Sequence, residues 1–280
     1  MSRRWKNRLF MAAMIASLAV SFGMLGWLLI DTLVNGVPGL SRQLFTAPPS
    51  TLPEEAGARP AILATIYLAV LLLAMTVPIG VGTAVYLEEY AHRERWYNRL
   101  LELNIQNLAA VPAIVYGILG LAFVVRGPFG IGRVLLAGAI ILTLVVLPTV
   151  IIAAREAIRA VPDSIRQGGF ALGATKWQVV SRQVLPAAIP GIATGSILAL
   201  SRAVGETAPL LLIGALQYVA FNPTILGAFS ALPVQIYTWI KLPQAEFQTL
   251  AAAAIIVLLV IVLSMNALAI FIRNRYRQTW

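Results

Sequence analysis

Residues 134–154, VLLAGAIILTLVVLPTVIIAA, contain no charged side chain and decide the fold class. An α-helix needs about 20 mostly apolar residues to cross the hydrocarbon core of a bilayer, and this run has that length. The whole chain has the same character, because 59% of its 280 residues are hydrophobic and 11% are charged. Soluble domains usually carry about 25% charged residues. The sequence therefore predicts an all-α polytopic membrane protein.

Five further apolar runs of comparable length flank this one, so we expect six transmembrane helices in a single membrane domain covering residues 1–280. The first run follows a basic segment, as in a signal peptide. It is longer than a signal core, however, and no A-x-A cleavage pattern follows it, so we expect it to remain as a span. The predicted spans are 9–30, 61–86, 108–125, 134–154, 189–215 and 250–272.

Positive charges are distributed unevenly between the predicted spans. Most of the 21 lysines and arginines lie in the two terminal segments, in the second-to-third loop and in the fourth-to-fifth loop. Such residues are enriched on the cytoplasmic side of membranes, so we expect both termini and these two loops in the cytoplasm. Topology then accounts for the net charge of +10 without nucleic acid as a partner. Residues 89–103 are expected to form either a helix at the cytoplasmic interface or a charged connector.

Several kinds of chemistry are excluded by the residues that the sequence lacks. With no cysteine and a single histidine, His92, we expect no disulfide, no thiol nucleophile and no metal site. No G-x-x-x-x-G-K-[ST] loop occurs, so ATP is not expected to bind by that route. We expect no cofactor in this chain and no covalent catalysis by it, so energy for active transport would come from a partner.

The fourth-to-fifth loop, 155–190, is too long and too patterned for a passive connector. Gly173 can adopt the left-handed conformation that ends a helix. Thr175 and Gln178 form the T-x-x-Q pattern of a capping box, which starts another helix. The pattern predicts two short helices joined by a tight turn.

Three interpretations of this loop are open. A helix-turn-helix with basic residues can bind DNA, but membrane spans flank this one directly. A packed cytoplasmic cap without a partner is the second interpretation. A docking surface for a cytoplasmic partner is favoured, because short exposed helices carrying Phe, Trp and Gly suit a groove on another protein.

The sequence ALGATKWQVVSRQVLPAAIPGI, residues 171–192, resembles the coupling loop of ATP-binding-cassette (ABC) importer permeases. Gly173 matches the glycine of that motif. Gln167, Gly168 and Gly169 stand where Glu-Ala-Ala or Glu-Ala-Ser is usual, so a carboxylate of the motif is missing. In this family the loop carries conformational change from the ATPase to the spans. The residues that the resemblance assigns to ATPase coupling are Gln167, Gly168, Gly169, Leu172, Gly173, Ala174 and Trp177.

Four further stretches extend the resemblance over nearly the whole chain. Residues 107–125, 147–162, 202–211 and 232–248 together resemble the permeases of phosphate importers, and GETAPL resembles the PstA type. The resemblance implies a type I importer permease in the bacterial plasma (inner) membrane that forms half of a translocation path. A permease for sulfate or molybdate, a stand-alone ion-coupled transporter and a membrane scaffold or sensor are the alternatives.

The same resemblance implies the partners. They are a sister permease (PstC-like), ABC ATPase subunits (PstB-like), an extracytoplasmic phosphate-binding protein (PstS-like) and membrane lipid. The external loops, above all residues 217–248, would receive the binding protein. ATP would be hydrolysed by the ATPase chains, so this chain is not expected to be an enzyme.

Two opposite charges, Arg202 and Glu206, lie within the predicted fifth span. A charge at the middle of a transmembrane helix costs about 2.5–3.5 kcal/mol, so it needs a reason to be there. One interpretation is an i, i+4 ion pair that holds helices together. Against a purely structural pair, Arg before Glu is the less favourable order, and Pro209 would leave the Gly205 carbonyl without its helical donor.

The other interpretation places these charges on the substrate pathway. A guanidinium offers planar paired donors that fit phosphate oxygens. Glu206 would hold Arg202 in position and prevent it from binding the anion too tightly, while Ser201 and Thr207 would add neutral hydrogen bonds. Earlier in the same span, Gly191 and Gly195 form a G-x-x-x-G step that favours close helix packing.

Overall fold

The computed structural model describes residues 3–92, 94–215 and 218–275, and these ranges contain helices and loops but no strand. Within these ranges five helices are long and apolar enough to cross a membrane, some of them together with adjoining turns. This confirms the all-α membrane class. The five are α1 (Arg3–Gly36), α3 (Arg59–Val85), α6 (Leu135–Arg159), α9 (Leu185–Val204) and α12 (Ala245–Arg275).

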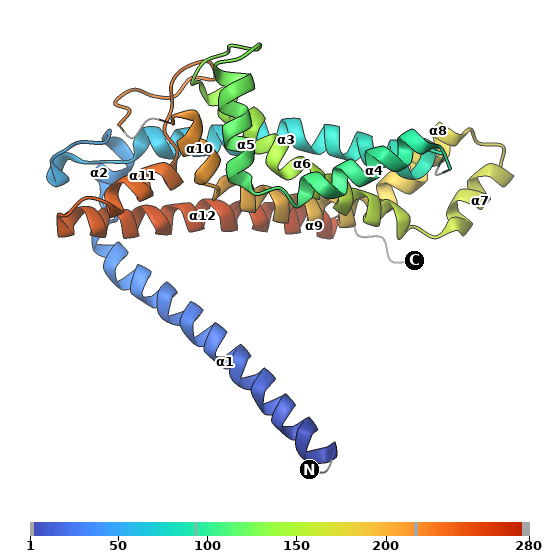
Figure 1. Cartoon of the computed structure of the whole chain (residues 1–280), viewed down its shortest axis with the longest axis horizontal. Helices are drawn as coiled ribbons and strands as arrows, with labels where there is room; N and C mark the ends of the chain where they lie inside the picture. Colours follow the sequence, from blue (N-terminus) through green and yellow to red (C-terminus); the bar gives the residue numbers. More distant parts are fainter. Residues whose placement is uncertain (1–2, 93, 216–217, 276–280) are drawn as a thin grey trace.

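Short elements gather at the two ends of the bundle that the long helices form (Figure 1). At one end lie α2 (Arg42–Thr46), α11 (Leu232–Ile240) and the 3₁₀ turns η1 (Val37–Gly39) and η2 (Pro53–Glu55). At the other end lie α7 (Asp163–Ala171), α8 (Lys176–Val179) and the π-helical turns η3 (Tyr86–Tyr90) and η5 (Val180–Val184).

The third predicted span, 108–125, is wrong as a continuous helix. Instead α4 (Trp96–Ala109) is followed by α5 (Ala113–Leu119), which the π-helical η4 (Gly120–Val125) extends. The two segments meet at 106° and together are apolar enough for one span. Pro112 explains the break, because proline lacks an N–H and its ring disfavours helical backbone in the preceding residue.

The helix expected to lie at the cytoplasmic interface within residues 89–103 has a different position in the structure. α4 begins at Trp96 and packs along α6 in the direction of the bundle, rather than across its end (Figure 1). Its apolar side chains Trp96, Leu100 and Leu103 are exposed on the surface of the bundle. The charged segment before it is therefore short, and the bent α4–α5 pair is long and apolar enough to count as a sixth span.

Close packing against α6 holds the centre of the bundle together. α3 and α9 lie on α6, and glycines bring the backbones near to one another. A Cβ added to Gly191 would lie 2.7 Å from the Cβ of Ala157, and one added to Gly195 would collide with the Cβ of Ala153. The expected role of the G-x-x-x-G step in helix packing is confirmed.

The first helix stands apart from the rest of the molecule. Figure 1 shows α1 projecting from the bundle, and no residue in the most apolar stretch of this helix is buried. It contacts the body through α12 and η1, close to its own C-terminal end. A helix with this much exposed apolar surface requires lipid or another protein around it.

Candidate functional site

The fourth-to-fifth loop forms the expected pair of short helices. α7 ends in a turn at Gly173, which has a φ of +77°, a value that favours glycine. The capping box is present, because the Thr175 backbone N–H donates to Gln178 Oε1 at 2.8 Å and the Gln178 N–H donates to Thr175 Oγ1 at 3.4 Å. The sequence pattern identified this local structure correctly.

Most of the residues assigned to ATPase coupling face outward. Leu172 is 87% exposed and Trp177 is 62% exposed, and Phe170 beside them is exposed as well. Gln167, Gly168 and Gly173 are also exposed, whereas Ala174 is half-buried. A hollow of about 390 Å³ between α7 and the start of α9 adds a concave region to this knob. The surface therefore combines projecting apolar side chains with a pocket, as a docking surface does.

Gly169 differs from its neighbour because it packs inside the loop. A Cβ at this position would lie 2.8 Å from Cγ2 of Val179, whereas a Cβ at Gly168 would meet no atom within 4 Å. The glycine at position 169 therefore allows α7 to approach the start of the following helix.

A buried apolar cluster attaches the loop to the ends of the long helices. It joins side chains from α3, α6, the segment after α6, and the helix formed by α8, η5 and α9. Its members include Ala84, Val85, Ile158, Val161, Val179, Val180 and Val184. The loop therefore forms one packed unit with the ends of three spans.

An arginine and glutamate cluster beside this apolar cluster was missed by sequence reasoning, which treated these charges only as topology signals. Buried Arg155 of α6 donates to Glu88 Oε1 from Nε at 2.8 Å and to Glu102 Oε1 from Nη2 at 2.8 Å. Arg159 Nη2 donates to Glu88 Oε1 at 2.7 Å. The sequence did carry a signal for this cluster. Two adjacent glutamates directly follow one apolar run, and an R-x-x-x-R pattern lies near the end of another apolar run.

The predicted ion pair in the fifth span is wrong, and so is the assumption of a continuous helix over residues 189–215. α9 ends at Val204, and α10 (Ala208–Ile213) begins after a short link. In the described ranges no hydrogen bond or ion pair joins Arg202 to Glu206. Pro209 lies in the first turn of α10, where a missing N–H is tolerated.

The side chains around this link have different surroundings. Arg202 is exposed in the last turn of α9, whereas Glu206 and Thr207 are half-buried. Thr207 Oγ1 donates to the Gly205 carbonyl at 3.4 Å. Ser201 instead turns toward α12 and donates to Oδ1 of Asn266, a residue that sequence reasoning missed. The structure therefore gathers three of the four predicted pathway residues at the link, while the hydroxyl of Ser201 is bonded to α12.

A second interrupted span lies against the first. α5 packs on α10, and a Cβ at Gly117 would lie 2.8 Å from Cα of Pro209. Irregular backbone at membrane depth is tolerated where protein buries it or where it borders a watery cavity. In secondary transporters, discontinuous helices typically form the substrate site, which makes such breaks a place to look for one here. The paired breaks therefore identify the region around Arg202 as the candidate pathway.

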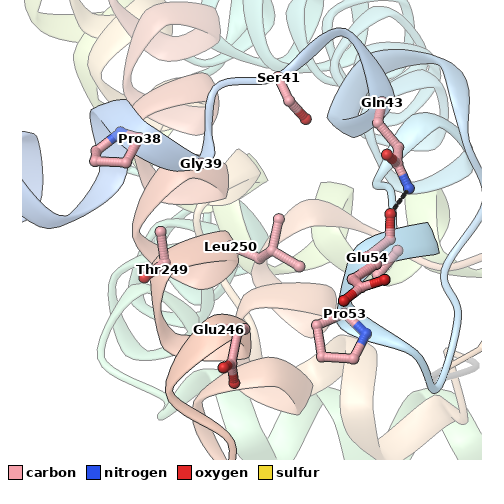
Figure 2. Close-up of a pocket in the computed structure, with 10 residues that line it drawn as sticks. Pro38, Gly39, Ser41, Gln43, Pro53, Glu54, Glu246, Thr249 and Leu250 are labelled. Atoms are coloured by element: carbon pink, nitrogen blue, oxygen red, sulfur yellow. Dashed lines mark hydrogen bonds between the residues drawn. The ribbon is translucent and has the colours of Figure 1, made fainter.

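A pocket of about 320 Å³ lies at the opposite end of the bundle from the coupling loop, beside the first turn of α12 (Figure 2). Glu54 and Glu246 contribute carboxylates, and the described lining residues include no lysine or arginine. Two negative charges disfavour an oxyanion, so this pocket does not suit phosphate. No group of three His, Asp or Glu side chains in the described ranges is arranged to hold a metal ion.

Known proteins resemble this chain in sequence and in fold. Residues 76–278 match the family described as "Binding-protein-dependent transport system inner membrane component". The phosphate transport system permease protein PstA of Yersinia pestis is 33% identical over 279 residues, covering 98% of this chain and 92% of that protein. PstA 1 of Mycobacterium tuberculosis (strain CDC 1551 / Oshkosh) is 33% identical over 276 residues, covering 97% and 90%.

Among solved structures, one chain of a bacterial alginate ABC transporter, crystallised with an alginate-bound periplasmic protein, gives a TM-score of 0.70. Its sequence is 18% identical, and the match covers 99% of each chain, so the likeness concerns the fold. The matched family, the relatives and the fold agree with one another. The chain belongs to the family of binding-protein-dependent transport system inner membrane components.

Proposed function

We propose that this chain is the transmembrane permease subunit of an ATP-driven phosphate importer and forms half of its translocation path. The phosphate-transport relatives support the substrate, and the exposed coupling loop supports a separate ATPase as the energy source. The observation that carries the proposal is an exposed guanidinium, that of Arg202, beside two interrupted spans. A cation at such a site offsets part of the desolvation of a phosphate anion.

The proposed complex contains a sister permease, ATPase subunits and an extracytoplasmic phosphate-binding protein. The loop around Leu172 would dock on the ATPase, and the opposite end of the bundle would receive the binding protein. The exposed apolar surface of α1 would be covered by the sister permease or by lipid. Both termini would face the cytoplasm, and ATP hydrolysis would belong to the partner chains.

The pathway residues take different roles in this proposal. Arg202 would bind phosphate oxygens, because its guanidinium is not held by Glu206. Glu206 would instead act by charge, since a nearby carboxylate repels an oxyanion and prevents overly tight binding that would slow release. Thr207 would add a hydroxyl near the same break.

The decisive experiment measures phosphate uptake into proteoliposomes that contain the co-expressed complex, its binding protein and internal ATP. Arg202→Gln should lower uptake about tenfold or more, because a hydrogen bond to a charged group contributes about 1.5–3 kcal/mol. Arg126→Gln is the matched control, since Arg126 is also exposed but follows η4 and is not part of the α9–α10 link. Its uptake should stay close to that of the wild type.

Other results would contradict specific parts of the proposal. Uptake of sulfate or molybdate in place of phosphate would change the substrate. Phosphate flux that needs no ATP would indicate an ion-coupled transporter. Failure of the Arg202→Gln complex to assemble would assign Arg202 to structure rather than to the pathway.

A further inference from the structure

The π-helical turn η3 at the end of α3 carries two adjacent glutamates that contact different elements. Glu88 pairs with Arg155 and Arg159 of α6 at 2.8 and 2.7 Å. Glu89 pairs with Arg166 of α7 at 2.9 Å. One turn of backbone is therefore attached both to the bundle and to the coupling loop. π-helical turns are rare and often occur at functional sites.

The guanidinium of Arg166 joins three elements at once. Its Nε and Nη2 donate to Glu89 Oε1 at 3.1 and 2.9 Å. Its Nη1 and Nη2 also donate to the carbonyls of Val161 and Ile158, at 2.7 and 2.9 Å, where α6 ends. The side chains of Arg166 and Glu89 are only 17% and 8% exposed. Limited contact with water strengthens the Coulombic attraction within this pair, and removal of one partner would leave a largely buried charge without compensation.

The second short helix of the loop is attached to the same turn. Lys176 of α8 places Nζ 5.0 Å from the ring centroid of Tyr90, which follows Glu89 in η3. An ammonium group at this distance from an aromatic ring is attracted by it. Both α7 and α8 are thus held on η3 by polar contacts, in addition to the apolar cluster beneath them.

Chain connectivity explains why such an attachment matters. α7 follows α6 after a short link, and α8 continues through η5 into α9, so displacement of the loop reaches these two spans through the backbone. α3 has no such link, because Glu89 and Arg166 are 77 positions apart in the sequence. Side-chain contacts must therefore connect α3 to the loop.

We propose that Glu89 and Arg166 are positioning residues for energy coupling, which make α3 move together with α7 when an ATPase displaces the loop. The proposal rests on the proposed function, because it requires an ATPase that acts on this loop. It assigns a transmission role to two residues outside the loop surface that touches the partner.

The test compares two carboxylates that bind the same guanidinium. Asp163 Oδ1 lies 3.2 Å from Arg166 Nη1, but Asp163 is on α7 itself and is 84% exposed. Glu89→Ala removes the ion pair between η3 and α7 but leaves the apolar cluster and the Lys176–Tyr90 contact in place. Asp163→Ala removes a carboxylate from the same guanidinium without breaking that ion pair. For each variant, phosphate uptake and ATP hydrolysis are measured in the same proteoliposomes with the binding protein, and phosphate transported per ATP is compared.

We expect the Glu89→Ala complex to assemble and to hydrolyse ATP but to transport about fivefold less phosphate per ATP. A fivefold effect corresponds to the low end of typical coupling free energies. Asp163→Ala should keep the wild-type ratio. Glu89→Gln retains an oxygen that can accept from Arg166 but loses the charge, so its ratio should fall between the two. A wild-type ratio in Glu89→Ala, or an equal fall in Asp163→Ala, would overturn the proposal.

If the Glu89→Ala complex does not assemble, the Glu89→Gln variant becomes the test. A wild-type ratio of phosphate transported per ATP in that variant would also overturn the proposal. Wild-type uptake tests the proposed function separately: if the unmodified complex moves no phosphate with ATP, that function fails. A wild type that transports normally beside variants with unchanged ratios rejects only the role of Glu89 and Arg166.

Discussion

Two adjacent residues of α9, Ser201 and Arg202, have different surroundings. Successive residues of an α-helix point about 100° apart, so neighbours in sequence lie on different faces. Ser201 donates to Asn266 of α12, whereas Arg202 is exposed beside the break after Val204. The hydroxyl therefore belongs to the contact between two spans, and the guanidinium remains available to an anion.

Ser201→Ala should consequently affect stability and leave phosphate affinity unchanged. Losing this hydrogen bond should lower stability by about 0.5–1.5 kcal/mol, a typical net value, with about 0.6 kcal/mol the average within membranes. The midpoint of thermal unfolding of the purified complex measures the first effect, and the phosphate dependence of uptake measures the second. Ser264→Ala is the control, because Ser264 is exposed on α12. A change in phosphate dependence with unchanged stability would return Ser201 to the pathway.

Among the elements, α7 has two adjacent glycines whose substitution distinguishes the effect of helix formation on stability from the effect of helix packing. Gly168→Ala should stabilise α7 by about 0.5–1 kcal/mol, because alanine loses less backbone entropy and the site has free space. Gly169→Ala should have the opposite effect, since its Cβ would press on Val179. The midpoint of thermal unfolding of the detergent-solubilised complex should therefore rise in Gly168→Ala and fall in Gly169→Ala. Equal midpoints in the two variants would show that the fit of α7 against Val179 of α8 does not limit stability.

The sequence predicted elements whose signals are local and failed where tertiary contacts decide. The apolar run 134–154 and the capping box at Thr175 and Gln178 depend on neighbouring residues, and both were identified correctly. The break after Val204 was missed because apolar residues resume in α10, directly after the short polar link. The pairing of Arg166 with Glu89 joins residues 77 positions apart, so no local pattern could indicate it.

At the scale of the whole molecule, a single copy of the chain leaves much of its apolar surface uncovered. α1 projects from the bundle in Figure 1, and the outward side chains of α4 and α12 are also apolar. Lipid covers apolar surface well, but a charged side chain such as that of Arg202 needs water or a polar partner within a membrane. The proposed sister permease would provide such surroundings if a watery path lies between the two subunits.

The proposed function fixes the orientation of the chain in the membrane. The coupling loop must face the ATPase, and the other end of the bundle must face outward. The chain has no cysteine, so a single introduced thiol is a unique target for a membrane-impermeant maleimide. Leu172 and Glu246 are both exposed and lie at opposite ends of the bundle, which makes Leu172→Cys and Glu246→Cys a matched pair.

Cells with a permeable outer envelope and an intact inner membrane should be labelled at Glu246→Cys only. Leu172→Cys should be labelled after the inner membrane is opened, because the basic residues of its loop favour the cytoplasmic side. Labelling of Leu172→Cys in sealed cells would invert the topology and with it the direction of transport, leaving the helical architecture unchanged.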